Sequence, residues 1–168
     1  AGLSDSEKTD LVSWWNLDST IPELTTAVYD NHHGGGEVLG TDELTCGDFS
    51  CSDPTDNWTT ISGSAEYSND SLVLLPSGKI RQNSITSAGN YYTVAYEVTE
   101  NLGANLQYYN GSAYVTIPSI VGTHSFDFLR LGSDNNFYLN QNYAGASASL
   151  TISSISVKLI NGNTGTLS

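Results

Sequence analysis

Alternation of apolar and polar residues is the clearest pattern in this chain, and it predicts a series of short β-strands. The segment 91–99 alternates most regularly, so every second side chain should point to the same face. The last segment, 150–160, alternates until its period slips at Ser153-Ser154, which predicts a bulge or a bend. The expected strands are residues 57–61, 65–67, 72–75, 79–85, 91–99, 105–109, 113–117, 124–131, 137–139 and 150–160.

Turn-forming residues separate these segments. Asn110-Gly111 lies between two of them and is a strong hairpin signal. No segment has a long helical pattern, so the succession of short strands and turns predicts an all-β protein built as a β-sandwich. Strand order cannot be deduced from this spacing.

The stretch 45–60 is expected to form the first strands of the sandwich and the turn between them. It reads as a short strand at 45–49, a polar turn at Asp53-Pro54 and a second short strand anchored by Trp58. Cys46 and Cys51 could form a disulfide only if the chain bends between them, because a straight strand would carry their Cα atoms out of bridging range. The alternative is a pair of reduced, buried thiols; a disulfide would fit a secreted or virion protein.

Residues 1–41 have a different character from the rest of the chain. Residues 11–17 predict a strand that carries Trp14 and Trp15, Tyr29 belongs to a second short strand, and a Gly-rich connector follows at 34–36. This opening resembles the start of concanavalin-like, laminin-G-type jelly rolls. The matching residues are Leu11, Val12, Trp15, Leu17, Asp18, Val28, Tyr29, Asp30 and Gly34.

A two-stranded fragment of this kind is not stable alone. Its Trp rings must be covered, either by its own sandwich or by a neighbouring molecule's. The connector permits both arrangements, and we expect the arm to add a strand to an open sheet edge of another subunit.

Residues 42–161 resemble carbohydrate-binding-module-like, galactose-binding-like jelly rolls. The matching residues, in chain order, are Leu44, Gly47, Asp48, Phe49, Asp56, Trp58, Gly89, Tyr91, Thr93, Val98, Gly122, Phe126, Phe128, Ile152, Ile155 and Val157. The resemblance implies an antiparallel jelly-roll β-sandwich over 42–161. The remaining residues, 162–168, are mostly Gly, Asn and Thr, and this composition predicts a loose tail. With the alternation, the resemblance places Phe49, Trp58, Val94, Tyr96, Phe126, Phe128, Ile152 and Val157 in the core.

Calcium-bearing members of that group use two carboxylates that this chain lacks. The closing Asp is replaced by Ser153 or Ser154, and the acidic residue after Phe49 is Ser50. Hard cations need several charged oxygen ligands, so the structural calcium site implied by the resemblance is doubtful here.

The net charge of the chain limits the classes of molecule that it is expected to bind. Eighteen acidic residues against five basic ones give a net charge of -13. This excess disfavours nucleic acid, anionic membranes and acidic glycans. No apolar run is long enough to span a membrane, so no membrane insertion is expected. Few Lys and Arg with many Ser, Thr, Asn, Gly and Tyr are typical of an extracellular β protein.

Candidate catalytic groups form no recognisable pattern. Two cysteines without a histidine at ligand spacing make no zinc site, and adjacent His32 and His33 point opposite ways on an extended chain. His124 begins a strand and suggests no catalytic triad. No motif distinguishes a carboxylate pair for glycoside hydrolysis, so we expect no enzyme, no metal ligand and no cofactor. The carboxylates considered are Asp42, Glu43, Asp48, Asp53, Asp56, Glu66 and Asp70.

The ten tyrosines are the informative excess. In each doublet, 91–92 and 108–109, one ring should face the core and the other the solvent. Outward rings beside amide side chains at 107, 110, 141 and 142 suit either a sugar ligand or a protein interface. The candidate aromatic residues are Tyr91, Tyr108, Tyr109, Tyr114 and Tyr143.

These observations predict a non-catalytic protein outside the cell or on a virion surface. The mosaic of two jelly-roll pieces favours a structural protein, such as a phage head decoration or fibre component, that assembles through its N-terminal arm with itself or with other surface proteins. The alternatives are a polysaccharide-binding module of a secreted enzyme or adhesin, and a subunit of a self-assembling extracellular filament.

Overall fold

The computed structural model describes residues 38–142 and 145–161. Most of the expected arm, with Trp14, Trp15 and Tyr29, lies outside this range, as do Tyr143 and the tail. The described elements are β1 (Val38–Asp42), the 3₁₀ turn η1 (Pro54–Asp56), β2 (Thr59–Ser62), β3 (Ala65–Tyr67), β4 (Leu72–Leu74), β5 (Lys79–Gln82), β6 (Tyr91–Asn101), β7 (Asn105–Tyr109), β8 (Tyr114–Ile117), β9 (Gly122–Leu129), β10 (Phe137–Asn142) and β11 (Leu150–Asn161).

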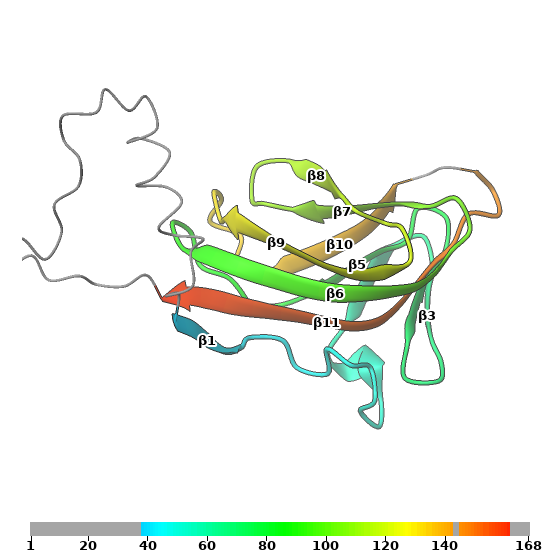
Figure 1. Ribbon diagram of the computed structural model, residues 1–168, viewed down its shortest axis with the longest axis horizontal. Helices are drawn as coiled ribbons and strands as arrows, with labels where there is room; N and C mark the ends of the chain where they lie inside the picture. Colours follow the sequence, from blue (N-terminus) through cyan, green and yellow to red (C-terminus); the bar gives the residue numbers. More distant parts are fainter. Residues whose placement is uncertain (1–37, 143–144, 162–168) are drawn as a thin grey trace, which may run out of the picture. The chain divides into compact units, whose positions relative to one another are not determined.

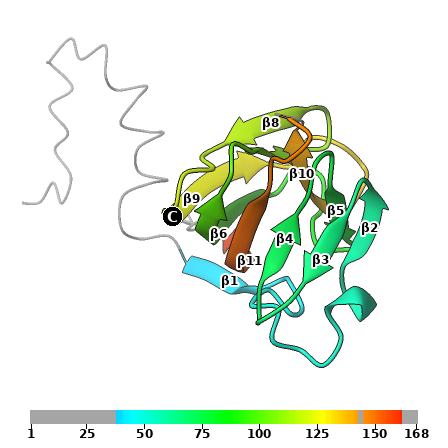
Figure 2. The same cartoon turned by 90° about the vertical axis from the view of Figure 1, so that its right-hand side faces the viewer.

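Two antiparallel sheets form a jelly-roll β-sandwich, as expected (Figures 1 and 2). The six-stranded sheet has the order β3-β4-β11-β6-β9, with β1 also paired to β11. The five-stranded sheet has the order β2-β5-β10-β7-β8. Strands far apart in sequence therefore lie side by side, and most neighbours in each sheet are brought together by crossovers between the layers. The sandwich begins at Val38 rather than near residue 42, because β1 pairs with the end of β11.

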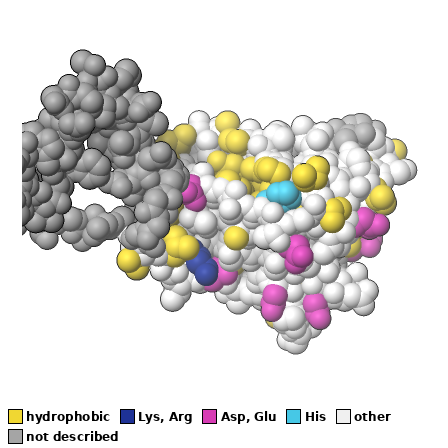
Figure 3. Space-filling view, in the orientation of Figure 1, with side chains coloured by type: hydrophobic (Ala, Val, Ile, Leu, Met, Phe, Trp, Pro, Cys, Tyr) yellow, Lys and Arg dark blue, Asp and Glu magenta, His cyan; other side chains and the backbone are white. Residues whose placement is uncertain are grey.

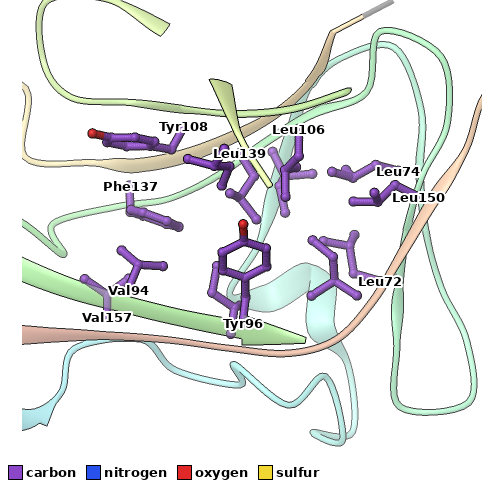
Figure 4. Close-up of a cluster of buried hydrophobic side chains, with 14 of the residues drawn as sticks. Leu72, Leu74, Val94, Tyr96, Leu106, Tyr108, Phe137, Leu139, Leu150 and Val157 are labelled. Carbon is purple, nitrogen blue, oxygen red and sulfur yellow. The ribbon is translucent and has the colours of Figure 1, made fainter. Parts of the chain in front are cut away.

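Alternating side chains from the two sheets meet in the core (Figure 4). On β6, Tyr92, Val94, Tyr96 and Val98 are buried while their sequence neighbours are partly or fully exposed. The long pairing of β11 with β6 shifts register around Ile152 and Ser154, so the predicted bulge is present. Of the expected core residues, Phe126 is only half-buried, because β9 is the outermost strand of its sheet.

The segment 45–49 is not a strand, which corrects the prediction. Cys46 and Phe49 both have a φ of 58°, and the chain turns sharply here. The bend brings the Cα atoms of Cys46 and Cys51 to 5.7 Å and joins the two residues in a disulfide. Trp58 packs beneath it with 1% of its surface exposed, and its indole N–H donates to the Cys46 carbonyl at 3.1 Å. The stretch is thus a compact loop that closes over the core.

This loop is tied to β11 at Gly47. The Ile155 amide donates to the Gly47 carbonyl at 2.7 Å, and a Cβ on Gly47 would lie 2.1 Å from the Ile155 carbonyl oxygen. Only glycine allows so close an approach of the two backbones. Asp53 caps η1 by accepting from the Thr55 amide, so the predicted polar turn is a single 3₁₀ turn.

Candidate functional site

The outer face of the five-stranded sheet gathers aromatic and amide side chains. Along β10, Phe137, Leu139 and Gln141 are buried, so the alternate residues between them point outward. The same alternation on β7 buries Leu106 and Tyr108 and turns their neighbours out. Cross-strand pairing then arranges the outward residues in two rows across the sheet.

The first row contains three tyrosines on three neighbouring strands, and we call Tyr138, Tyr109 and Tyr114 the tyrosine row. Tyr109 on β7 is paired directly with Tyr114 on β8, and their ring centroids are 5.1 Å apart. The ring of Tyr138 on β10 lies edge-on to Tyr109 at 5.7 Å. Arg81 on β5 is paired with Tyr138 and continues the row. The row runs ~10 Å across three strands.

The second row is polar. Lys79 is paired with Asn140, Asn140 with Gln107, and Gln107 with Thr116. The Asn140 amide donates to Gln107 at 3.0 Å, and the Gln107 amide donates to the Thr116 hydroxyl at 3.3 Å. These hydrogen bonds hold the side chains at fixed positions, with further donors and acceptors available toward the solvent.

Lys79 and Tyr114 meet above the second row. Their strands are separated by β10 and β7, so about 14 Å of backbone separation lies between them. The Lys79 ammonium nevertheless lies 4.7 Å from the centroid of the Tyr114 ring. Both side chains must lean inward over Asn140 and Gln107 to make this contact.

Arg130 supports the tyrosine row from below. Arg130 is 1% exposed, and its guanidinium carbon lies 5.5 Å from the Tyr109 ring centroid. The guanidinium donates to the Tyr109 carbonyl at 2.9 Å and to the Asp134 carbonyl. The Asp134 carboxylate in turn accepts from the Tyr138 hydroxyl at 2.7 Å. Arg130 therefore holds Tyr109 in position, and Asp134 holds Tyr138.

The predicted aromatic residues divide between the two faces and the interior. In each doublet one ring faces in and the other out, as expected: Tyr92 and Tyr108 are buried, while Tyr91 and Tyr109 point outward. The prediction of Tyr108 as a contact residue was wrong, because its ring packs in the core at 4.5 Å from Phe126. Burial also raises the pKa of the Tyr108 hydroxyl.

Of the remaining candidates that the structure describes, Tyr109 and Tyr114 lie together. Tyr91, 51% exposed, is on the opposite sheet. Gln141, expected near the site, is buried in the core because it shares the inward face with Leu139. Sequence reasoning missed Tyr138, Lys79 and Arg81, although alternation with the buried Phe137 and Ile80 could have indicated that they point outward.

Three of the carboxylates considered for catalysis, Asp42, Asp48 and Asp53, instead accept hydrogen bonds that hold the local backbone in place. Asp42 accepts from the amides of Leu44 and Val157, both at 3.0 Å. Asp48 accepts from the amide and the hydroxyl of Ser50, and these hydrogen bonds lower its pKa. Asp53 is the cap of η1, and bonds from Thr55 lower its pKa in the same way. An open hollow beside Asp42 and Asp48 is otherwise lined by Gly47 and by residues of β6, β9 and β11, among them the hydroxyl residues Thr123, Ser154 and Ser156.

At two positions where calcium-bearing members carry carboxylates, this chain has serines whose hydroxyls donate to neighbouring carboxylates. The Ser50 hydroxyl donates to Asp48 at 2.8 Å, and the Ser153 hydroxyl donates to Glu97 at 2.8 Å. Within residues 38–142 and 145–161, no three His, Cys, Asp or Glu side chains gather closely enough to hold a metal. The same part of the chain contains no helix long and apolar enough to cross a membrane.

Comparison with protein-family models gives no match, and neither does comparison with curated proteins. Solved structures that the chain resembles include carbohydrate-binding modules and a phage tailspike domain. The CBM22-1 xylan-binding domain of Paenibacillus barcinonensis Xyn10C is 12% identical, with a TM-score of 0.48 over 72% of this chain and 96% of that one. The second N-terminal cellulose-binding domain of Cellulomonas fimi β-1,4-glucanase C is 12% identical, with a TM-score of 0.45 over 75% and 97%. The enzymatically active domain of bacteriophage CBA120 tailspike protein 4 is 14% identical, with a TM-score of 0.48 over 71% and 21%.

Proposed function

We propose that this domain is a non-catalytic, extracellular module that binds a polysaccharide along the outer face of its five-stranded sheet. The observation that carries the proposal is the tyrosine row, aligned across three strands beside a row of amide and hydroxyl side chains. Aromatic rings cover the apolar faces of sugars, and fixed polar groups bind their hydroxyls. The disulfide between Cys46 and Cys51 suits an oxidising, extracellular location.

A repeating ligand suits this geometry because the rows cross the sheet rather than enclose a pocket. The row of tyrosines gives stacking surfaces at successive strand positions, and Asn140 and Gln107 are held parallel to it. A chain of sugar rings could contact both rows at once, so several weak contacts would add up.

Titration with soluble polysaccharides and ¹H–¹⁵N NMR provides the test. We expect binding to at least one polysaccharide, with the largest shifts at the amides of β10, β7 and β8. Amides of β6 and β11 on the opposite sheet serve as the internal control and should not move. No binding to any member of a broad panel, or shifts confined to the six-stranded sheet, would refute the proposal.

A structural role through self-assembly is the second candidate, and the position of β9 as the outermost described strand of its sheet favours it. Ile120 and Val121 precede this outermost strand with 70% and 63% of their surfaces exposed. On the outer face of the six-stranded sheet, apolar side chains gather beside a histidine (Figure 3). The His124 imidazole lies 2.8 Å from the Ile120 carbonyl. We propose that residues 11–17 of a second copy add to this edge, giving an oligomer or filament of a virion or cell surface.

Light scattering of the full chain tests this assembly. Replacing Trp14 and Trp15 by serine, or Ile120 and Val121 by serine, should shift the mass toward the monomer. The control is Leu102→Ser, which changes a 58% exposed apolar residue in the β6–β7 turn. A full-length protein that is already monomeric at high concentration, with and without calcium, would exclude assembly through the arm.

A further inference from the structure

Charge is distributed unevenly between the two sheets. The five strands of the five-stranded sheet contain no Asp or Glu, but they carry Lys79 and Arg81. The strands of the other sheet carry five carboxylates and a single Lys, and acidic side chains are scattered over its outer face (Figure 3). In a chain of net charge -13, the face with the tyrosine row is thus locally basic.

Neither cation of this face has a carboxylate partner among the described residues. The Lys79 ammonium lies over the Tyr114 ring, and the Arg81 Nε is buried without a hydrogen-bond acceptor. Asp134 is the carboxylate beside the row, and it is engaged by the Tyr138 hydroxyl and lies 3.9 Å from Arg130. Arg81 as a whole is only partly buried and lies in line with Tyr138, so the carboxylate of a ligand could approach its guanidinium from the solvent side of the sheet.

The contact between Lys79 and Tyr114 is easily exchanged. A cation over an aromatic ring at an exposed site is a weak interaction, whereas a charge-assisted hydrogen bond to a carboxylate is stronger. If Lys79 turned toward an anion, the Tyr114 ring would be uncovered for a sugar at the same time. A single movement of the Lys79 side chain would therefore expose the Tyr114 ring for stacking and bind the negative charge of the ligand.

We propose that the ligand of this face is an acidic polysaccharide containing uronic acids. This inference rests on the proposed function. The carboxylate of one sugar binds Arg81 and Lys79, while neighbouring rings of the chain lie on the tyrosine row. Arg presents its donors in a planar fork that matches a carboxylate, and Lys adds a mobile positive charge.

The negative charge of the rest of the molecule favours binding of an acidic ligand at the five-stranded sheet over binding elsewhere. The net charge disfavours acidic glycans for the protein as a whole, but it does so most strongly over the six-stranded sheet. A polyanion repelled there is accommodated only where Lys79 and Arg81 lie, so the ligand is directed to one face.

Calorimetry with oligogalacturonate and its carboxyl-reduced form, at fixed ionic strength, tests the inference. We expect the acidic form to bind at least tenfold more tightly. Lys79→Gln and Arg81→Gln should each weaken its binding by about ten- to hundredfold, and the reduced form should be affected much less. Lys158→Gln removes the same charge from β11 on the other sheet and should leave the affinity unchanged.

Each other outcome has a separate meaning. Equal binding of the acidic and the reduced form would overturn the acidic ligand while leaving polysaccharide binding intact. Binding of neither form, nor of alginate, glucuronoxylan, xylan or cellulose oligosaccharides, would overturn both. Equally tight binding of polyglutamate would identify a general anion surface and overturn the sugar class.

Discussion

Replacing Tyr109 by alanine should reduce the affinity for the polysaccharide by about ten- to hundredfold, equivalent to roughly 1.4–2.8 kcal/mol. Tyr109 is the middle ring of the row, in contact with Tyr114 on one side and Tyr138 on the other. Its removal takes away a stacking surface and also the support that orders both neighbours. Calorimetric titration of the variant against the same ligand measures the loss.

Two further variants separate recognition from folding. Tyr109→Phe keeps the ring and should retain most of the affinity. Tyr91→Ala removes an equally large ring from the outer face of the other sheet, so it should bind like the unchanged protein. An unaltered affinity in Tyr109→Ala, or an equal loss in Tyr91→Ala, would show that the row is not the binding surface.

Replacing Trp58 by alanine should lower the free energy of unfolding by about 3–5 kcal/mol. The indole is almost fully buried, contacts the ring of Phe49 with centroids 5.9 Å apart, and donates its N–H to the Cys46 carbonyl. The substitution leaves a cavity beneath the disulfide loop and removes one of the two N–H groups that donate to the Cys46 carbonyl. Urea unfolding followed by circular dichroism gives the change directly.

Trp58→Phe and Ile61→Ala are the matched controls. The first keeps an aromatic ring in the core and should cost less than alanine. The second truncates a nearby residue on β2 that is 41% exposed, so its effect should stay within about 0.5 kcal/mol. A Trp58→Ala protein as stable as the Ile61→Ala protein would mean that the loop does not anchor the core.

Local patterns were enough to locate most strands. The alternation over 91–99 corresponds to β6, the slip at Ser153-Ser154 to the bulge of β11, and Asn110-Gly111 to the β7–β8 hairpin. Each of these three features depends on residues that are adjacent in sequence. The two-residue period of a strand and the residue preferences of a turn are therefore sufficient to predict them. The error at 45–49 has the opposite cause, because long-range contacts with Trp58 and Ile155 fix that bend.

The sequence by itself determined the all-β class, the alternation of inward and outward residues and the excess of acid over base. Only the tertiary structure decided which outward residues meet, because the order of strands in a sheet is independent of their spacing along the chain. That order placed Tyr138 beside Tyr109, brought Lys79 to Tyr114, and put Tyr91 on the opposite face. It also separated the charges, so that a strongly acidic chain presents one face whose strands carry cations and no carboxylate. A net charge is a sum over the molecule, whereas a ligand responds to the charges within a Debye length of its site.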